Sequence, residues 1–249
     1  MSHIKSEWFT TFNQSKLENT RLFTFPFSGA GAVIYQPWVK DFNNTDIQLV
    51  GVQLPGREAR LHEPALLNLD LLVEKLSIAI LPYTNQPYSF FGHSLGGLVA
   101  FELSRKLRKL DANLPEHLFV SAFRAPDMIN PNPILHRLSD HDLIEKMRVY
   151  GGTAEAIISN EDLMAILLPI IRADFTLFEN YYYQIEPPLD VPITALSGQI
   201  DHVVKPSYMT DWILQTNQTF EHHIYEGDHF FLSKNQDEIV RMLTSKLLP

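Results

Sequence analysis

The sequence contains no cysteine. This absence excludes disulfide bonds, a thiol nucleophile and any metal site with cysteine ligands. It fits a cytoplasmic protein, although a chain without disulfides is compatible with any compartment. The polar stretch 1–16 lacks the apolar segment of a signal peptide, so we expect no secretion and a cytoplasmic location.

Long apolar runs and a surplus of positive charge are also missing. No run approaches the roughly 18–20 apolar residues that a membrane-spanning helix needs, so we expect no membrane contact. The formal net charge is -9, and nucleic acid is not expected as a partner, because phosphate binding requires excess lysine and arginine. Several of the few basic residues crowd one short stretch, 105–109.

What is present suits one domain over residues 1–249. Of the 249 residues, 45% are apolar and 20% are charged, so a large core and a polar surface are both possible. Short β-type runs alternate with longer helical ones, which predicts a mainly parallel sheet flanked by helices. The predicted strands are 22–25, 47–53, 88–91, 118–122, 193–197 and 223–225, and the predicted helices are 69–81, 96–110 and 236–248.

The stretch from about 126 to 183 breaks this alternation, since no convincing strand is found in it. Ser139 and Asp142 have the spacing of a capping box, with aspartate in place of the usual glutamate or glutamine, and indicate a helix start. We therefore expect a helical insertion over the sheet, with the role of a lid. The alternative is a strand that the pattern does not reveal.

The motif that carries most chemistry is Gly92-His93-Ser94-Leu95-Gly96, which follows a predicted strand and precedes a predicted helix. In that context Gly-x-Ser-x-Gly predicts the sharp turn of α/β-hydrolases, on which the serine is the nucleophile. The turn also places the backbone N–H of Leu95 at the first turn of the helix, where negative charge is favoured.

A serine hydroxyl is a weak nucleophile and needs a base that takes its proton. In α/β-hydrolases the chain order is serine, acid, histidine. His229 is the favoured base, because the loop 226–231 follows a predicted strand and precedes the last helix. The competing histidines after Ser94 are His136, His141, His202, His222 and His223.

Asp201 is the favoured acid, because it lies in the loop after the predicted strand 193–197. The oxyanion hole needs a second backbone donor from the loop after an early strand. The loop 25–32 fits, and the N–H of Ser28 or of a neighbour could pair with that of Leu95. The alternative is a glycine-rich turn without a catalytic role. The competing acids are Asp190, Asp211 and Asp228.

Six segments spread over most of the chain follow a common pattern: 25–30, 53–58, 92–97, 168–175, 198–201 and 227–230. Together they resemble type II thioesterases of polyketide and nonribosomal peptide biosynthesis. Many hydrolases share the nucleophile turn, whereas Pro-Gly-Arg-Glu at 55–58 and Arg-Ala-Asp-Phe at 172–175 are far more specific. Ser28 replaces the family's usual alanine and Ala30 its usual glycine. A backbone donor at Ser28 should still serve, but Ala30 could constrain the loop.

The resemblance implies an α/β-hydrolase fold and an editing thioesterase that removes acyl groups from the phosphopantetheine arm of acyl or peptidyl carrier proteins. It implies Ser94, Asp201 and His229 as catalytic residues, and Ser28 and Leu95 as backbone donors of the oxyanion hole. The insertion would be a lid over the acyl chamber. We expect neither a cofactor nor a metal, because the substrate itself carries the phosphopantetheine, and we expect a monomer.

Other functions are open for the same residues. A stand-alone esterase or lipase acting on small acyl esters or acyl-CoA would share the triad. An acyltransferase or lactone-forming cyclase, and an idle interaction module on the same fold, are further alternatives.

Docking to a carrier protein raises a question of charge. Carrier proteins are usually acidic, as this chain is, so docking would need a local basic patch. The cluster 105–109 with Arg57, Arg60 or Arg124 could supply it; otherwise the cluster is a solvated helix face.

Overall fold

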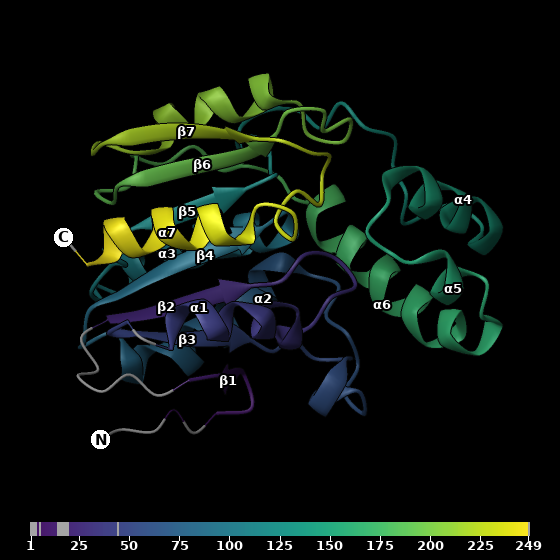
Figure 1. The fold of residues 1–249 in the computed structure, drawn as a ribbon, viewed down its shortest axis with the longest axis horizontal. Coiled ribbons are helices and arrows are strands. Elements are labelled where there is room, and N and C mark those ends of the chain that lie inside the picture. The colour runs from purple at the N-terminus through teal and green to yellow at the C-terminus, as the bar shows by residue number, and fades with distance from the viewer. Residues whose placement is uncertain (1–3, 5, 14–19, 44, 249) are drawn as a thin grey trace.

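One sheet with helices on both faces organises the molecule (Figure 1). A computed structural model describes residues 4, 6–13, 20–43 and 45–248, so part of the polar stretch 1–16 lies outside the described residues. Within them, seven strands form one sheet in the order β1-β3-β2-β4-β5-β6-β7. Only the β1–β3 pair is antiparallel among these. The strands are β1 (Phe9–Thr11), β2 (Thr20–Phe25), β3 (Ile47–Val52), β4 (Tyr88–His93), β5 (Leu118–Ser121), β6 (Ile193–Gly198) and β7 (Phe220–Tyr225).

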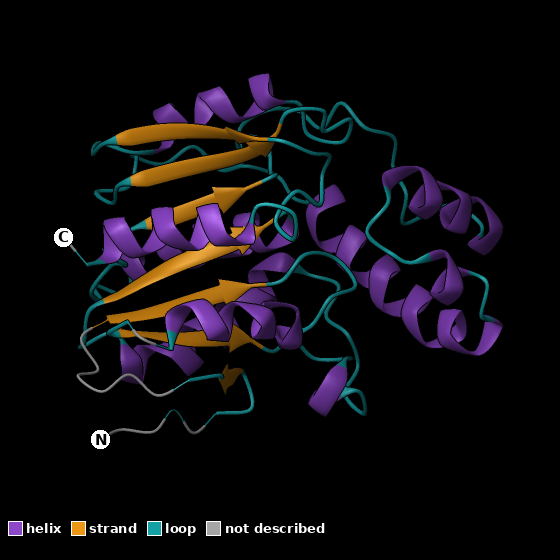
Figure 2. Ribbon diagram, viewed as in Figure 1, coloured by secondary structure: helices purple, strands orange, loops and turns teal. Residues whose placement is uncertain are grey.

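Helices cover both faces of this sheet, α1 and α7 in front and α2 and α3 behind in the view of Figure 2. Because successive strand residues point to opposite faces, neighbours such as Phe90 and Phe91 of β4 are buried in two separate cores. The predicted mainly parallel α/β fold is confirmed. The helices are α1 (Val39–Phe42), α2 (Leu69–Ile80), α3 (Leu95–Lys109), α4 (Asp140–Tyr150), α5 (Glu155–Ile158), α6 (Glu161–Glu179) and α7 (Gln236–Leu247), with 3-10 helices η1 (Ala32–Trp38), η2 (Glu58–Arg60), η3 (Leu81–Tyr83) and η4 (Pro206–Gln215).

The structure adds elements that the sequence pattern did not predict: β1, the helical stretch η1–α1 and η4. β1 has three residues, too few for an alternating pattern to be recognised. β7 begins at Phe220, three residues before the predicted start at 223. Only Tyr225 of its six residues is buried, so its apolar signal is weak.

Residues 126–183, all of them described, contain α4, α5 and α6 and no strand. Ser139 caps α4 by accepting a hydrogen bond from the N–H of Asp142 at 3.1 Å, at the predicted helix start. These helices have a small core of their own and extend past the carboxyl ends of the strands (Figure 1). That they act as a lid stays a prediction. No helix in the described part of the chain is both long and apolar enough to cross a membrane.

Candidate active site

Ser94 lies alone between β4 and α3, on a turn that few residues can adopt. Its φ of +53° and ψ of -123° are unusual for a residue other than glycine, and such strain persists only where surroundings enforce it. The Ser94 N–H donates to Ser121 O at 2.7 Å. A Cβ on Gly92 would lie 2.1 Å from Gly96 O, and one on Gly96 would lie 2.1 Å from Phe25 O. Both glycines are therefore required by the close approach of backbone segments around the serine.

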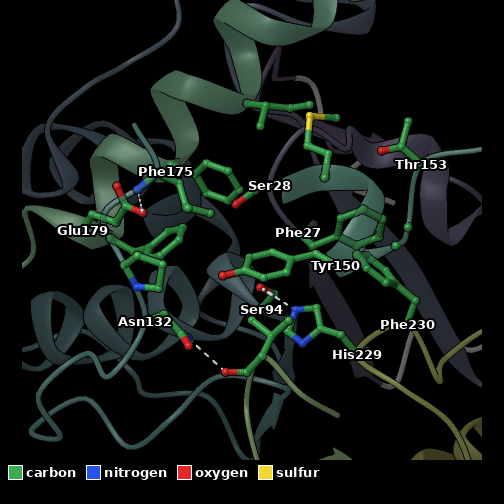
Figure 3. Close-up of a pocket in the computed structure, with 18 of the residues that line it drawn as sticks. Phe27, Ser28, Ser94, Asn132, Tyr150, Thr153, Phe175, Glu179, His229 and Phe230 are labelled. Carbon is green, nitrogen blue, oxygen red and sulfur yellow. Dashed lines mark hydrogen bonds between the residues drawn. The ribbon is translucent and has the colours of Figure 1, made fainter. Parts of the chain in front are cut away.

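Three predicted side chains meet in a hydrogen-bonded series. His229 Nε2 lies 3.1 Å from Ser94 Oγ, and its Nδ1 lies 2.8 Å from Asp201 Oδ2. Figure 3 shows Ser94 and His229 facing one another at the edge of a cavity. With the ring proton on Nδ1, His229 donates to Asp201 and can accept the proton of Ser94, which is the arrangement of nucleophile, base and orienting acid.

The second oxygen of Asp201 fixes the direction of the carboxylate. Oδ1 accepts the N–H groups of Val203 and Val204 at 2.7 and 2.8 Å, so Oδ2 is the oxygen left for His229. The two loops approach closely: a Cβ on Gly198 would lie 2.1 Å from Asp228 O. Asp201 and His229 are thus brought together by backbone packing at the ends of β6 and β7.

The competing candidates have other surroundings. Asp228 accepts the N–H of Phe230 at 2.8 Å and so stabilises the loop of His229. Asp211 and His202 are exposed. The partners of the remaining candidates are Glu179 for His136, Asp142 for His141, Ser197 for His222, Glu221 for His223 and Asn217 for Asp190.

Two backbone donors are available near Ser94: Ser28 lies in the loop after β2, and Leu95 begins α3. Gly29 N donates to Asp174 Oδ2 at 2.7 Å, so this neighbour of Ser28 is already engaged. The N–H groups of Ser28 and Leu95 donate no hydrogen bond within the described residues. Figure 3 shows Ser28 at the same cavity as Ser94. The two donors expected for an oxyanion hole therefore have no internal acceptor.

His93 lies directly beside His229, with the two ring centroids 5.4 Å apart. Burial, and secondly the charge of His229, hold the pKa of His93 well below its ordinary value. Its Nδ1 lies 2.8 Å from Ser121 Oγ. A neutral His93 does not repel the imidazolium that forms on His229 when Ser94 loses its proton.

An apolar cavity opens in front of Ser94, between the sheet and the inserted helices. It encloses about 730 Å³ of empty space, including the part open to solvent. Sequence reasoning missed these lining residues, although the 171, 175 and 178 spacing on α6 is that of one helix face and could have revealed them. The apolar side chains around it include Phe27, Leu135, Met147, Tyr150, Ile171, Phe175, Phe178 and Phe230.

Glu179 is an acidic side chain in this cavity wall and is held by several donors. Glu179 accepts the N–H groups of Leu135 and His136 at 2.8 and 2.9 Å. His136 Nδ1 lies 2.5 Å from the same carboxylate. Glu179 therefore connects the end of α6 to the loop before α4, and both of its carboxylate oxygens accept hydrogen bonds from that loop.

The basic cluster 105–109 on α3 is engaged in ion pairs, and only part of it is a solvated helix face, since the Lys109 side chain is 58% exposed. Its role in carrier docking stays a prediction. The Arg105 side chain is 3% exposed and pairs with Glu102 and Glu186. Arg108 and Lys109 pair with Glu186 too. Their acidic partner lies about 80 residues further along the chain, where the local sequence pattern does not reveal it.

The other proposed docking arginines are buried as well. Arg57 pairs with Asp174 at 2.6 Å, and Arg60 pairs with Glu63 at 2.6 Å. Arg124 makes no ion pair within 4.0 Å in the described part of the chain.

The amino-acid sequence is similar to those of known proteins. A family model described as "Thioesterase domain" matches residues 20–247. The linear gramicidin dehydrogenase LgrE of Brevibacillus parabrevis is 37% identical, over 99% of this chain and 95% of its own length. The gramicidin S biosynthesis protein GrsT of Aneurinibacillus migulanus is also 37% identical, over 97% of this chain and 94% of its own length.

The fold is also similar to that of solved thioesterase structures. The type II thioesterase BorB from the borrelidin biosynthetic cluster is 32% identical, with a TM-score of 0.90, and the match covers 99% of this chain and 100% of that one. The predicted α/β-hydrolase fold is thereby confirmed.

Proposed function

Because the chain belongs to the thioesterase domain family, we propose that Ser94 takes the acyl group of a thioester and that water then releases the acid. The chain is a hydrolase. The observation that carries the proposal is the series Ser94–His229–Asp201, with 3.1 and 2.8 Å between the bonded atoms, at the mouth of an apolar cavity.

The substrate that we propose is an acyl thioester on the phosphopantetheine arm of an acyl or peptidyl carrier protein. Solved structures similar to this chain include type II thioesterases, among them BorB. This likeness favours an editing thioesterase of polyketide or nonribosomal peptide biosynthesis over a stand-alone esterase for small acyl esters or acyl-CoA. The name of LgrE is that of a dehydrogenase, but the serine, histidine and aspartate of this chain support hydrolysis.

In the first step Ser94 Oγ attacks the thioester carbonyl carbon while its proton passes to His229 Nε2. The negative charge that develops on the carbonyl oxygen is stabilised by the N–H groups of Ser28 and Leu95. One such donor is typically worth about 3 kcal/mol to the transition state. The carbon–sulfur bond then breaks, and His229 returns the proton to the departing sulfur, which leaves as the thiol.

In the second step water hydrolyses the serine ester. His229 Nε2 takes a proton from the water as its oxygen attacks the acyl carbon, so a second oxyanion forms in the same place. The ester bond to Ser94 Oγ breaks, and His229 gives the proton back to this oxygen. Asp201 stays hydrogen-bonded to Nδ1 throughout and stabilises the imidazolium in both steps.

We propose further that the apolar cavity is the acyl chamber and that the helices of 126–183 form a lid over it. The apolar side chains that line the cavity, among them Phe27, Ile171 and Phe175, suit an acyl chain. Action as a monomer, a cytoplasmic location and the lack of a cofactor stay predictions.

The test compares one acyl group on three leaving groups: a holo carrier protein, coenzyme A and a simple oxygen ester. A carrier-directed thioesterase has its highest kcat/KM on the acylated carrier. A stand-alone esterase hydrolyses the simple ester as well or better, and that order would contradict the proposal. A fluorophosphonate is expected to label Ser94 in an active enzyme and to leave it unlabelled in an idle interaction module.

A further inference from the structure

A second, wider hollow lies beside the acyl chamber, and we call it the entrance groove. It encloses about 1590 Å³ of empty space, including the part open to solvent. The two hollows share Asn130, Asn132, Phe178 and Glu179 in their walls, so they adjoin. The groove's rim carries strongly exposed apolar side chains: Ile129, Tyr182 and Ile185 are 88%, 83% and 93% exposed.

Arg124 lies in the wall of this groove and has few partners for a buried cation. The residue is 7% exposed. Its Nε donates to Met128 O at 3.1 Å, and its guanidinium lies 5.1 Å from the centre of the Phe123 ring. Its two terminal nitrogens donate no hydrogen bond in the described part of the chain, and neither is sealed from solvent. Because Arg124 lines the groove, its terminal N–H groups are available to a ligand that enters there.

The acidic groups of the groove do not neutralise Arg124. Glu186 is bound by Arg105, Arg108 and Lys109, and Glu179 is held by the loop before α4. Asp127 is exposed and lies more than 4.0 Å from any cationic nitrogen of the described residues.

Burial without a carboxylate partner is costly for a guanidinium. Burial is the main cause that lowers the pKa of Arg124. An anion that enters the groove would supply the missing counter-charge.

The backbone around Arg124 is fixed before any ligand arrives. Ala122 has a φ of +51°, a strained value for alanine, and its N–H donates to Leu196 O at 2.9 Å. Trp212 Nε1 donates to Phe123 O at 2.7 Å, and Ala125 N donates to Tyr208 O at 3.0 Å. A side chain on such a rigid loop loses little conformational freedom when it binds.

We propose that Arg124 binds the phosphate of the phosphopantetheine arm, which lies in the entrance groove while its thioester end reaches Ser94. The planar guanidinium offers two parallel N–H groups that match two phosphate oxygens. The apolar rim would contact the carrier protein next to the phosphate. This inference rests on the proposed function, since it assigns the part of the same substrate that lies furthest from the reacting carbonyl.

The test uses two thioesters of the same acyl group, one on 4′-phosphopantetheine and one on pantetheine, which lacks only the phosphate. The wild type is expected to prefer the phosphorylated thioester. In Arg124→Gln this preference, the ratio of the two kcat/KM values, falls about 10- to 100-fold, the loss expected for a charge-assisted hydrogen-bonded pair. Arg124→Lys keeps the charge and retains part of the preference.

Two further variants sharpen the assignment. Arg108→Gln removes a guanidinium that is already paired with Glu186, so the preference is expected to stay as in the wild type. Asp127→Asn removes a negative charge from the groove wall and is expected to increase the preference.

Each contrary outcome has its own meaning. An equal loss of kcat/KM on both thioesters in Arg124→Gln assigns a structural role to Arg124 and overturns the inference, as does a wild type without preference. Failure of the proposed function looks different, because the wild type then hydrolyses neither thioester. Calorimetric binding of free 4′-phosphopantetheine and pantetheine to Ser94→Ala tests the phosphate site without turnover or an Arg124 variant. Equal affinity for the two would also overturn it.

Discussion

Arg57 and Asp174 are 117 residues apart in sequence and form a buried two-point ion pair, with Nη1–Oδ2 at 2.6 Å and Nη2–Oδ1 at 2.7 Å. Both partners also bind the loop that supplies Ser28. Asp174 Oδ2 accepts the N–H of Gly29 at 2.7 Å, and Arg57 Nη1 donates to Ala30 O at 3.1 Å. The pair therefore fixes the loop after β2 against α6 and the loop after β3.

Asp174→Asn is expected to destabilise the protein by about 3–5 kcal/mol, because it leaves the Arg57 guanidinium buried without its counter-charge. Thermal and urea unfolding measure this loss. The double variant Arg57→Met/Asp174→Leu is the control, since it removes both charges and is expected to lose less stability than Asp174→Asn. Equal stability of wild type and Asp174→Asn would contradict a structural role for the pair.

Asp201→Asn is expected to lower kcat about 10,000-fold while the fold is retained. The amide keeps the shape of the side chain but favours the wrong ring tautomer of His229. Steady-state hydrolysis of an acyl-carrier substrate gives the rate, and thermal unfolding checks the fold. Asp228→Asn is the matched control, because Asp228 binds the N–H of Phe230, and its kcat should change far less. A comparable loss in both variants would argue against Asp201 as the orienting acid.

Phe175→Ala is expected to shift the acyl preference towards longer or bulkier groups by severalfold in relative kcat/KM. The substitution enlarges the proposed chamber and removes an edge contact with Phe178, whose ring centre lies 5.5 Å away. Ile166→Ala on the same helix is the control, since Ile166 is 48% exposed and does not line the cavity. The acyl preference is measured as relative kcat/KM in competition among carrier proteins that bear acyl groups of different length. An unchanged profile in Phe175→Ala would refute the assignment of the cavity.

His117 is expected to make the protein less stable in mild acid. Burial, then the charge of Lys246, lowers the pKa of His117 from 6.5 to about 4. The unfolded chain therefore gains a proton as the pH falls below about 6.5, and the folded chain does not. The contribution of His117 to the unfolding free energy is fully present above about pH 6.5 and is lost as the pH falls from about 6.5 to 4. At pH 5 the loss from this residue alone is about 2 kcal/mol.

The variant His117→Gln is expected to show a shallower fall in unfolding free energy between pH 7 and pH 5. Glutamine can still bond Thr194, to which His117 Nε2 lies at 2.8 Å. His141→Gln, whose histidine side chain is 84% exposed in the wild type, should follow the wild-type curve. Identical pH curves for wild type and His117→Gln would contradict the assignment. Burial also lowers the pKa values of His93 and His222, so part of the fall remains in the variant.

The sheet and the meeting of Ser94, Asp201 and His229 follow from local signals. Each of the three residues follows a predicted strand, and the carboxyl ends of parallel strands meet at one edge of the sheet. The strands before Ser94 and Asp201 are fully buried, whereas β7 before His229 has only a weak apolar signal. The glycines around Ser94 and before Asp201 are needed for close backbone approach, which is why a short motif marks the turn.

Long-range pairing could not be predicted in the same way. The sequence marked Arg57 and Asp174 only through their resemblance to a family, and no local pattern states that the two side chains meet. The partner that Arg105, Arg108 and Lys109 share, Glu186, lies about 80 residues away. The local sequence therefore does not show that these charges are paired. The apolar cavity beside Ser94 depends on how three inserted helices pack over the sheet, and amphipathic spacing alone does not determine that packing.

The most direct test of the account is mass spectrometry of the intact protein and its peptides after brief mixing with acylated carrier proteins. The account predicts a mass increase equal to the acyl group, located on the peptide that contains Ser94, and its absence in Ser94→Ala together with the loss of hydrolysis. An acyl group found on another residue, or hydrolysis that continues in Ser94→Ala, would contradict it.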